Sequence, residues 1–274
     1  MTEGTRQPPQ ALLSVLDRIV DGARSHIHGR PSVIGLAGPQ GSGKTTLARA
    51  WSGMHPAIAH FSLDDVYLDQ EQRRQLAATV HPLLATRGPP GMHDLALLIE
   101  TLDRLSEAGE ADRTPIPCFD KVADARIPAA EWPAFAGRPS AILLDGWCLG
   151  ALPEADVALA DPINDLEAQE DPKGVWREYV NERLKRDYPA IWDRLDAILY
   201  LQAPSWDVVA RWRGQQEADL LGRPLSIADD ARIARFVQHF ERVTRAMQAG
   251  ARRPGTVVRL GAERQLLSVD AAAR

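Results

Sequence analysis

The sequence predicts a doubly wound α/β fold in which helices cover both faces of a mainly parallel sheet. Apolar runs of strand length alternate along the chain with segments whose apolar residues recur every three or four positions. This alternation is typical of parallel sheets with helical crossovers. Glycine-rich or acidic stretches directly follow three of the apolar runs. Ligands of such sheets bind beyond the carboxyl ends of the strands, so these stretches mark the predicted site.

Length and composition fit one such domain and exclude several classes of protein. The chain has 274 residues, of which 45% are hydrophobic and 25% charged, as in ordinary globular proteins. Its net charge of −5 offers no broad basic surface, so we expect no nucleic-acid partner. The two cysteines lack CxxC spacing, which suits a reducing compartment. No signal-peptide pattern or bilayer-spanning apolar run is visible, so we expect a cytoplasmic protein without a membrane partner.

The first half of the chain predicts two strands with helices around them. The predicted elements are a helix at about 10–28, a strand at 32–38, a helix at about 44–52, a strand at 57–65, a short helix with an ordered loop at 69–92 and a helix at 94–108. Leucines at three- and four-residue steps define the helices, and Pro and Gly mark the loop.

The second half predicts three further strands. The predicted elements are an extended segment at 114–121, a strand at 140–147, a helix at 171–189 with Pro172 near its start, a strand at 197–204, helices at about 205–219 and 228–248, and a strand at 256–260. The strands are short apolar runs, as expected for a sheet buried on both faces.

A phosphate-binding loop is predicted between the first strand and the helix that follows it. The segment 38–45, GPQGSGKT, matches the pattern GxxxxGK[ST] in the strand and helix context that the motif requires. Glycines allow backbone N–H groups to close around phosphate oxygens, and the lysine reaches the β- and γ-phosphates. The candidate nucleotide-binding residues are Gly38, Pro39, Gln40, Gly41, Ser42, Gly43, Lys44, Thr45 and Thr46.

Two other interpretations of this segment are weaker. A dinucleotide-binding turn would need a third glycine, but Lys44, Thr45 and Thr46 follow Gly43. A glycine-rich surface turn with an exposed lysine would not need the strand and helix context. The motif therefore predicts a nucleoside triphosphate, and we expect ATP. A signalling GTPase is disfavoured because the chain has no N-K-x-D motif.

Carboxylates at the ends of two other strands narrow the predicted chemistry. Asp64 and Asp65 end the second strand, and phosphoryl transfer to an alcohol needs a carboxylate that orients the hydroxyl and takes its proton. Asp64 is the candidate base, while Asp65 and Tyr67 are candidates for substrate contact. The alternative is that the acids only cap a loop. Asp145 ends the strand AILLD, where a carboxylate would hold Mg²⁺ together with Thr45.

Two arginines on the helix after the fourth main strand are candidates for closing over the phosphates. Arg211 and Arg213 lie at the position of a lid in many small-molecule kinases. Guanidinium groups there would neutralise charge on the transferred phosphoryl group. Solvated arginines on a helix face are the alternative.

These residues carry a family resemblance. The chain resembles the D-glycerate 3-kinase family of P-loop kinases, relatives of uridine kinase, phosphoribulokinase and bacterial pantothenate kinase, from about Val33 to Val243. The segments that carry it are SLDDVYL, HPLLATRGPPGMHD, PCFDK, LLDGWCLG, Asn164 ahead of a helix, and RWRGQQE. The resemblance implies a three-layer nucleoside-kinase-like fold and favours Asp64 over Asp65 as the base.

The resemblance also implies an acceptor site. The stretch RGPPGMHD is similar to the family signature R-G-x-P-G-T-H-D, which implies that Arg87, His93 and Asp94 line the acceptor site. An arginine can pair bidentately with a carboxylate, and His and Asp can bond hydroxyls. Asp120 and Lys121 resemble the Asp-Lys that ends a further family segment, so they are candidates for the same site. An ordinary surface turn is the alternative for this loop.

The sequence departs from the family pattern close to this predicted pocket. Met92 stands where the family usually has Thr, Phe119 and Val122 replace Tyr and Ser, and Asp145 replaces Glu. A kinase remains the prediction, with the acceptor less closely defined than the chemistry.

We therefore expect an ATP- and Mg²⁺-dependent kinase that phosphorylates a hydroxyl of a small hydroxy acid, with D-glycerate as first choice. The expected domain has an N-terminal helix (about 10–28), an acceptor-site insertion (about 66–135) and a lid region (about 205–225). Two alternatives stay open: a P-loop kinase for a nucleoside or pantothenate-like alcohol, and a non-catalytic regulatory NTP-binding protein. The sequence does not indicate an oligomeric state.

Overall fold

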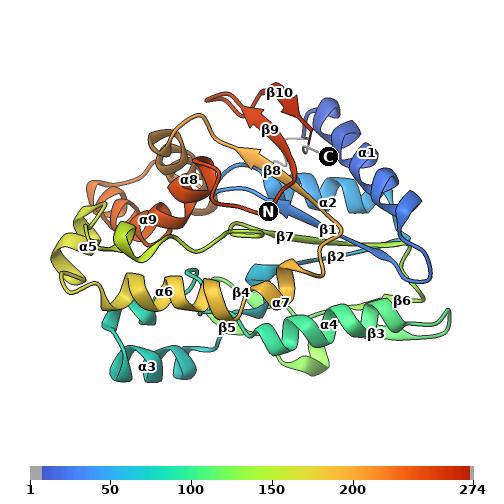
Figure 1. Ribbon diagram of the computed structural model, residues 1–274, viewed down its shortest axis with the longest axis horizontal. Coiled ribbons are helices and arrows are strands. Elements are labelled where there is room, and N and C mark those ends of the chain that lie inside the picture. The colour runs from blue at the N-terminus through green and yellow to red at the C-terminus, as the bar shows by residue number, and fades with distance from the viewer. Residues whose placement is uncertain (1–7, 272–274) are drawn as a thin grey trace.

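Six strands form the central sheet of the structure, a computed structural model that describes residues 8–271 (Figure 1). The strands are β1 (Ser32–Ala37), β2 (Ile58–Ser62), β7 (Ala141–Gly146), β8 (Ala197–Gln202), β9 (Thr256–Leu260) and β10 (Leu266–Asp270). They lie in the order β10-β9-β8-β1-β7-β2, and every neighbouring pair is parallel except β9 with β10. The predicted doubly wound, mainly parallel sheet is confirmed.

The centre of the sheet is buried on both faces. Every residue of β1 and β7 is buried, and their sequences SVIGLA and AILLDG lack the polar alternation of a strand with one wet face. Strands β2 and β7 lie on one side of β1, while β8 and β9 lie on the other. The strand order therefore reverses at β1, and a crevice for a ligand is expected beyond its carboxyl end.

Helices cover the two faces of this sheet. The α-helices of the described residues are α1 (Gln10–His26), α2 (Lys44–Met54), α3 (Gln70–Thr79), α4 (Leu95–Glu107), α5 (Asp165–Glu170), α6 (Val175–Arg186), α7 (Pro189–Trp192), α8 (Trp206–Leu221) and α9 (Ile227–Gln248). Helices α1 and α2 lie over one face, and α4, α6 and α7 lie over the other (Figure 1).

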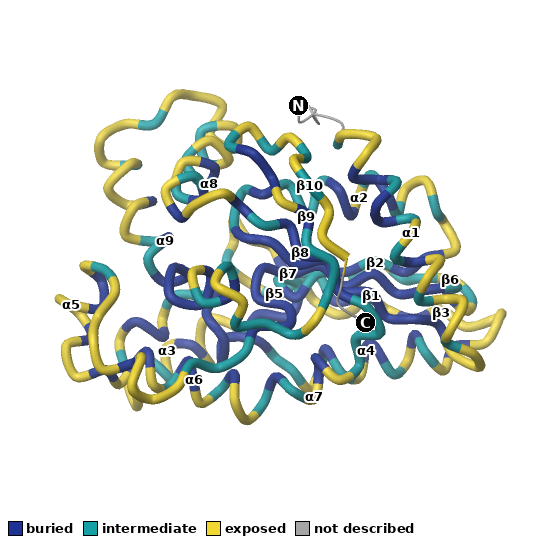
Figure 2. The backbone as a smooth tube through the Cα atoms, turned by 45° about the horizontal axis from the view of Figure 1, so that its top comes forward, coloured by how far each residue is buried: buried dark blue, intermediate teal, exposed yellow. Residues whose placement is uncertain are grey.

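Each face of the sheet has its own hydrophobic core. Figure 2 shows the central strands in the dark blue of buried residues. One core contains Trp51 and Trp212, and the other contains Trp147 and Tyr188. Helix α9 contributes to both cores, so it fastens the two layers to each other.

The connection from β2 to β7 carries most of the additional structure. It contains the 3-10 helices η1 (Leu63–Val66), η2 (Pro82–Ala85) and η3 (Ala129–Glu131), together with α3 and α4. It also contains two small antiparallel sheets, β3 (Arg113–Pro115) with β6 (Ala134–Ala136) and β4 (Phe119–Asp120) with β5 (Ala125–Arg126). A further 3-10 helix, η4 (Asp156–Leu159), follows β7.

The structure differs from the predicted elements in two instructive places. Helix α6 begins at Val175 rather than at Pro172, because Gly174 has a φ of +79° and forms a left-handed cap before it. Strand β10 lies in a tail whose sequence predicted no element, and it pairs with β9 as an antiparallel edge with a register shift between Leu266 and Ser268. Pairing with the neighbouring strand stabilises such an edge strand more than its own sequence pattern does.

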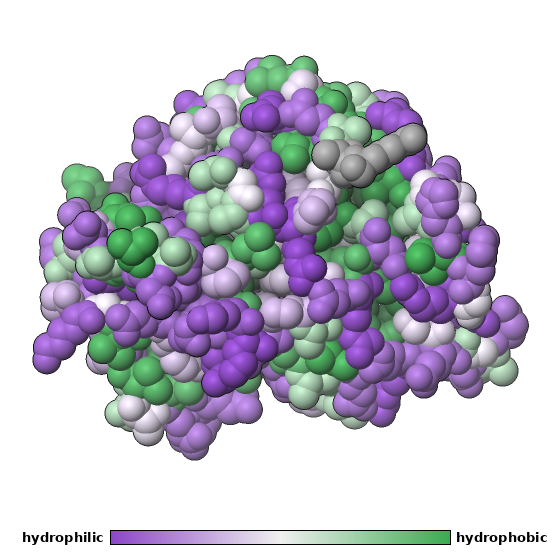
Figure 3. All heavy atoms as spheres, viewed as in Figure 1, coloured by the Kyte–Doolittle hydropathy of each residue, from purple (hydrophilic) through white to green (hydrophobic). Residues whose placement is uncertain are grey.

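The surface of the molecule is mixed in character. On the face seen in Figure 3, hydrophilic side chains predominate and hydrophobic ones form small separate groups. Within residues 8–271, no helix combines the length and the apolar character needed to cross a membrane.

Candidate active site

The glycine-rich segment 38–43 turns between β1 and α2. Gly41 and Gly43 have φ angles of +70° and +86°, in the left-handed region that glycine adopts without strain. A Cβ atom on Gly41 would lie 2.6 Å from Cβ of Trp212 in α8, whereas a Cβ on Gly43 would have no atom within 4 Å. Gly41 therefore permits close packing of the loop against α8, while Gly43 serves the backbone conformation alone.

The loop also holds buried polar atoms without a protein partner. Among residues 8–271, Ser42 Oγ and Gln40 Oε1 are buried and accept or donate no hydrogen bond. The N–H of Ser42 donates to the carbonyl of Pro39 at 3.2 Å and closes the turn. The Ser42 hydroxyl, an unpartnered donor just before an 11-residue helix, fits an oxygen of a bound phosphate group, whereas the Gln40 oxygen can only accept a hydrogen bond.

Lys44 and Thr46 lie in the first turn of α2, directly after this loop. Burial lowers the pKa of Lys44, although the negative charges of Asp64 and Asp145 act in the opposite direction. The net effect is a lowered pKa, and an anionic ligand beside the loop would favour the charged form of Lys44.

Asp145 ends β7 and is fully buried beside the loop. The Thr45 hydroxyl donates to its Oδ2 at 2.9 Å, and Nε2 of His60 lies 3.4 Å from its Oδ1. Burial raises the pKa of Asp145, but the hydrogen bond with His60 and the charges of His60 and Lys44 outweigh burial and bring it below its usual value. An ionised carboxylate next to a hydroxyl is a donor set that suits Mg²⁺.

Thr45 and Asp145 are too few ligands to bind a metal ion without further ligands from outside the protein. In the part of the chain that the structure describes, no group of three His, Cys, Asp or Glu side chains could hold a metal ion. Magnesium in phosphoryl-transfer sites takes one or two protein ligands and completes its shell with water and substrate phosphates. Thr45 and Asp145 therefore fit Mg²⁺ that arrives with a nucleotide.

Asp64 lies in η1, just beyond the carboxyl end of β2, and both of its oxygens are engaged. The Tyr67 hydroxyl donates to Oδ1 at 2.7 Å, and Nζ of Lys121 lies 2.6 Å from Oδ2. Burial raises the pKa of Asp64, but the charges of Lys121 and Lys44 outweigh it and hold the pKa well below the usual range. Asp64 is therefore an ionised carboxylate at neutral pH.

Asp65 has a different environment although it is the next residue. Its Oδ2 accepts the backbone N–H of Ser62 at 2.9 Å, and the Ser62 hydroxyl accepts the N–H of Asp64 at 3.2 Å, which together form a capping box around η1. Burial raises the pKa of Asp65 to about 6. These contacts agree with the loop-capping alternative, and the substrate contact of Asp65 stays a prediction.

His93 lies opposite Tyr67 and close to Asp64. Residues 67 and 93 form an isolated antiparallel bridge, and their rings stack with centroids 4.9 Å apart and an interplanar angle of 25°. Nδ1 of His93 lies 2.6 Å from the hydroxyl of Tyr188, while Nε2 is buried and has no partner within residues 8–271. Burial lowers the pKa of His93 to about 4, against the opposing effect of Asp64.

Arg87 fastens the segment that carries Lys121. Its guanidinium group donates to Oδ1 of Asp124 at 2.5 Å and to the carbonyl of Lys121 at 3.0 Å, and it lies over the ring of Phe119. Arg73 binds the other oxygen of Asp124 at 2.7 Å. Both terminal nitrogens of Arg87 are thus bound to protein groups, and its contact with the acceptor stays a prediction.

The two remaining predicted acceptor residues act as caps in this structure. Asp94 is the N-cap of α4, since Oδ1 accepts the N–H of Leu97 at 3.1 Å, and its Oδ2 accepts from Arg126 at 3.1 Å. Asp120 accepts the N–H groups of residues 122 and 123 at 2.8 and 3.0 Å and is exposed. Arg126 links Asp94 to Tyr67, because its guanidinium group also donates to the Tyr67 carbonyl. The Asp120 carboxylate bonds the backbone of the turn that follows it.

The two predicted lid arginines are bound within the protein. Arg211 donates to the carbonyl of Ala262 at 3.2 Å. Arg213 pairs with Glu217 at 2.7 Å and lies over the ring of Phe236, where burial lowers its pKa. The hydrogen bonds of these two side chains go to residues outside the phosphate loop. Their closure over the phosphates stays a prediction.

Arg264, which the sequence did not indicate, contacts the phosphate loop instead. Its Nε donates to the carbonyl of Gly41 at 2.6 Å, and its guanidinium lies over the ring of Trp212. Trp212 itself donates to the carbonyl of Ala262 at 2.7 Å. The sequence offered no signal for Arg264, His60 or Tyr188, because none of them belongs to a recognisable motif.

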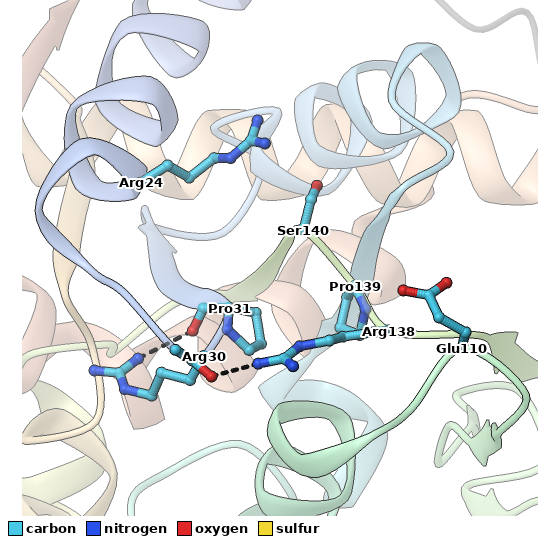
Figure 4. A pocket seen from close by; sticks show the side chains of 8 residues that line it. Arg24, Arg30, Pro31, Glu110, Arg138, Pro139 and Ser140 are labelled. Carbon is cyan, nitrogen blue, oxygen red and sulfur yellow. Dashed lines mark hydrogen bonds between the residues drawn. The ribbon is translucent and has the colours of Figure 1, made fainter.

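A separate hollow of about 460 Å³ opens at the opposite edge of the sheet, where β1 and β7 begin (Figure 4). Figure 4 shows Arg30 and Arg138 in its lining, bonded to the backbone carbonyls of Pro31 and Gly29. Arg30 also pairs with Asp196. These contacts engage Arg30 and Arg138. Ligands of this fold bind at the carboxyl ends of the strands, whereas the hollow lies at the amino ends of β1 and β7.

The fold and the loop together define a P-loop kinase: a glycine-rich turn lies at the strand-order reversal, Thr45 and Asp145 lie beside it, and the ionised carboxylate of Asp64 lies just beyond the end of β2. The chain is 31% identical over 224 residues to an uncharacterized kinase of Schizosaccharomyces pombe, mug58, covering 77% of this chain and 79% of that one. It belongs to the D-glycerate 3-kinase family of P-loop kinases.

Other comparisons agree with this membership. A chloroplastic D-glycerate 3-kinase of Arabidopsis thaliana is 35% identical over 224 residues, which is 77% of this chain and 46% of the plant protein. The chain therefore spans about half of that relative. The solved structure of a D-glycerate 3-kinase from Cryptococcus neoformans superposes with a TM-score of 0.75 at 22% identity, covering 96% of this chain and 98% of that one, so it shares the fold. No protein-family model matches the chain.

Proposed function

We propose that this kinase transfers the γ-phosphoryl group of ATP to a hydroxyl of a small hydroxy acid, with D-glycerate as the first candidate. The observation that carries the proposal is Asp64, an ionised carboxylate beyond the end of β2 that lies within the electrostatic reach of Lys44. Its other neighbour is the cation Lys121. The likeness to a relative named D-glycerate 3-kinase supports the choice of acceptor.

The nucleotide side of the reaction rests on the loop and on α2. Lys44 and the backbone N–H groups of residues 41–45 would hold the β- and γ-phosphates, and Thr45 with Asp145 would hold Mg²⁺. Bound Mg²⁺ supplies positive charge that offsets the charge of the phosphate oxygens. His60 keeps Asp145 ionised and oriented toward Thr45.

Asp64 would orient the attacking hydroxyl and accept its proton. Its low pKa means that it takes the proton only as the new oxygen–phosphorus bond forms, which agrees with the loose transition state of phosphoryl transfer. The oxygen of Asp64 that now faces Lys121 must become available to the hydroxyl, and the phosphoryl oxygens are a natural new partner for the released ammonium group.

The charge around Asp64 favours an anionic acceptor. Lys121 bonds Asp64, Arg126 bonds Asp94 and the Tyr67 carbonyl, and Arg87 bonds Asp124 and the Lys121 carbonyl. Each guanidinium group has five N–H donors, so both arginines keep donors beyond these contacts. A substrate carboxylate would find several cationic donors there. A neutral nucleoside would leave them without a new partner.

The proposal is tested by a coupled ADP-release assay with Mg-ATP and a panel of hydroxy acids, sugars, nucleosides and pantothenate. Turnover with D-glycerate well above all other compounds is the expected result. Turnover with a neutral alcohol alone would retain the chemistry but refute the acceptor class. Tight ATP binding without turnover on any compound would refute the catalytic proposal and favour a regulatory NTP-binding protein.

Two apolar residues favour a different small alcohol as the second candidate for the acceptor. Phe119, which departs from the family pattern, is buried and packs edge-on against Tyr67 with ring centroids 5.4 Å apart. Met92 is fully buried one residue before His93. Two apolar replacements near the acceptor residues change the shape of the predicted pocket, so the panel includes longer hydroxy acids as well.

A further inference from the structure

Tyr188 makes a pair of hydrogen bonds that fixes where the protons of His93 lie. Tyr188 follows α6, is fully buried, and places its hydroxyl 2.9 Å from the backbone N of Gly91 and 2.6 Å from Nδ1 of His93. Gly91 has a φ of +96°, and a Cβ there would lie 2.9 Å from side-chain atoms of Tyr179 and Arg183. The position of the Gly91 N–H is therefore set by close packing.

Counting protons leaves one arrangement in which the Tyr188 hydroxyl both accepts and donates a hydrogen bond. A backbone N–H can only donate, so the phenol oxygen of Tyr188 accepts from Gly91. The phenol has one proton of its own, and Nδ1 of His93 is the partner that the structure gives it. If Nδ1 carried a proton instead, the Tyr188 hydroxyl proton would be buried without an acceptor, which is costly. His93 then carries its proton on Nε2.

The remaining nitrogen of His93 is the one without a partner. Nε2 is buried and has no hydrogen-bond partner within residues 8–271, and His93 as a whole is only 5% exposed. The bridge between residues 67 and 93 places the two rings side by side, and the Tyr67 hydroxyl reaches Asp64. The unpartnered Nε2–H thus belongs to the ring that stacks on Tyr67, and Tyr67 donates a hydrogen bond to the proposed base, Asp64.

We infer that Tyr188 is a positioning residue that fixes His93 as a neutral hydrogen-bond donor, whose Nε2–H binds an oxygen atom of the acceptor substrate. This inference rests on the proposed function and deepens it. His93 does not act as a base, because its unprotonated nitrogen is occupied by Tyr188. The substrate atom that it meets must accept a hydrogen bond, as a carboxylate or hydroxyl oxygen does and an ammonium group does not.

The proton position is measured directly by NMR of protein labelled with ¹⁵N-histidine, without substrate. His93 is assigned by comparison with His93→Ala. We expect long-range ¹H–¹⁵N correlations in which Nδ1 is unprotonated and Nε2 protonated at pH 7, and a shift toward a mixture of tautomers in Tyr188→Phe. A protonated Nδ1 in the wild-type protein would overturn the inference.

Kinetics test the link to the acceptor. Tyr188→Phe removes only the hydroxyl, and we expect the KM of the acceptor to rise on the order of tenfold while the KM of ATP stays within about twofold. Tyr200→Phe is the matched control, since Tyr200 is also buried and its hydroxyl donates to the carbonyl of Arg253 at 2.9 Å. Equal changes in both KM values, or the same effect from Tyr200→Phe, would refute the role.

A double-mutant cycle separates positioning from general structure. If Tyr188 acts through His93, Tyr188→Phe adds little to the acceptor KM of His93→Ala. Fully additive effects would contradict the inference. The NMR result also separates this inference from the proposed function. If His93 carries its proton on Nε2 but the protein does not phosphorylate glycerate, only the proposed acceptor is refuted. If the protein phosphorylates glycerate but His93 carries its proton on Nδ1, only the inference about Tyr188 is refuted.

Discussion

Replacing Asp64 with asparagine tests the catalytic assignment, and Asp65 next to it provides a matched control. In Asp64→Asn the amide keeps one oxygen to accept the Tyr67 hydroxyl, so the shape of η1 is preserved. The variant loses the charge that faces Lys121 and the capacity to take a proton. In Asp65→Asn the amide keeps an oxygen for the Ser62 N–H and with it the capping box. The two variants therefore differ in chemistry and hardly in fold.

The expected magnitude follows from these contacts. A positioned general base contributes roughly 10²- to 10⁴-fold to turnover, or about 3–5 kcal/mol of barrier. Asp64→Asn should lower kcat by that factor, and Asp65→Asn should leave kcat within about threefold. ATP binding should persist in Asp64→Asn and even tighten slightly, because a negative charge near Lys44 and the phosphates is removed.

The assay is steady-state ADP release with a saturating acceptor, together with calorimetric titration of each variant with nucleotide. Near-normal turnover of Asp64→Asn would refute the assignment of this carboxylate as the base. An equal loss in both variants would show that the environment of η1, and not the Asp64 carboxylate itself, sets the rate.

Three further predictions concern the loop, the pH dependence and the acceptor. Gly41→Ala should reduce the free energy of unfolding by about 2–4 kcal/mol, because the new methyl group clashes with Trp212 and alanine disfavours a positive φ. Gly43→Ala has no such clash and should reduce it by about 1 kcal/mol. Equal losses of the two variants in urea unfolding would contradict the packing argument. Because burial raises the pKa of Asp65 to about 6, the folded chain binds a proton more readily than the unfolded one and loses stability as pH rises from about 4 to about 6. Asp65→Asn should therefore be more stable than wild type by up to about 3 kcal/mol at pH 7 and equal at pH 4, and a pH-independent difference would refute this. Arg87→Ala should raise the acceptor KM at least about tenfold more than the ATP KM in the ADP-release assay, and an equal effect on both would argue against a carboxylate contact.

The sequence predicts the parts of the fold whose signals are local. Buried strands such as 32–37 are continuous apolar runs, and α4 has leucines at helical spacing, so both are predicted within a few residues. Strand β10 depends on pairing with β9, and the start of α6 depends on the left-handed Gly174, so neither has a pattern of its own. Elements that depend on a neighbour are the ones that were missed.

The phosphate loop was the easiest part of the site to predict, for a physical reason. Its motif encodes backbone conformation through Gly41 and Gly43, which need only their own φ angles and the helix that follows. The acceptor side depends on side chains from distant segments: Arg87 bonds Asp124, and His93 bonds Tyr188 across 95 positions. A motif marks such residues as candidates but does not indicate which atom of each is already occupied.

Asp64 and Asp65 show most clearly what only three dimensions decide. They are identical, adjacent and both largely shielded from water, and burial raises the pKa of each. Two lysines that lie 20 and 57 positions away face Asp64 and reverse the effect, whereas the main group that binds Asp65 is one neutral backbone N–H. The same residue type thereby has a lowered pKa at position 64, where we propose the base, and a raised pKa at position 65, where its carboxylate caps η1. The difference arises because consecutive side chains of the 3-10 turn after β2 meet different partners: Asp64 meets Tyr67 and Lys121, whereas Asp65 bonds back to the backbone N–H of Ser62.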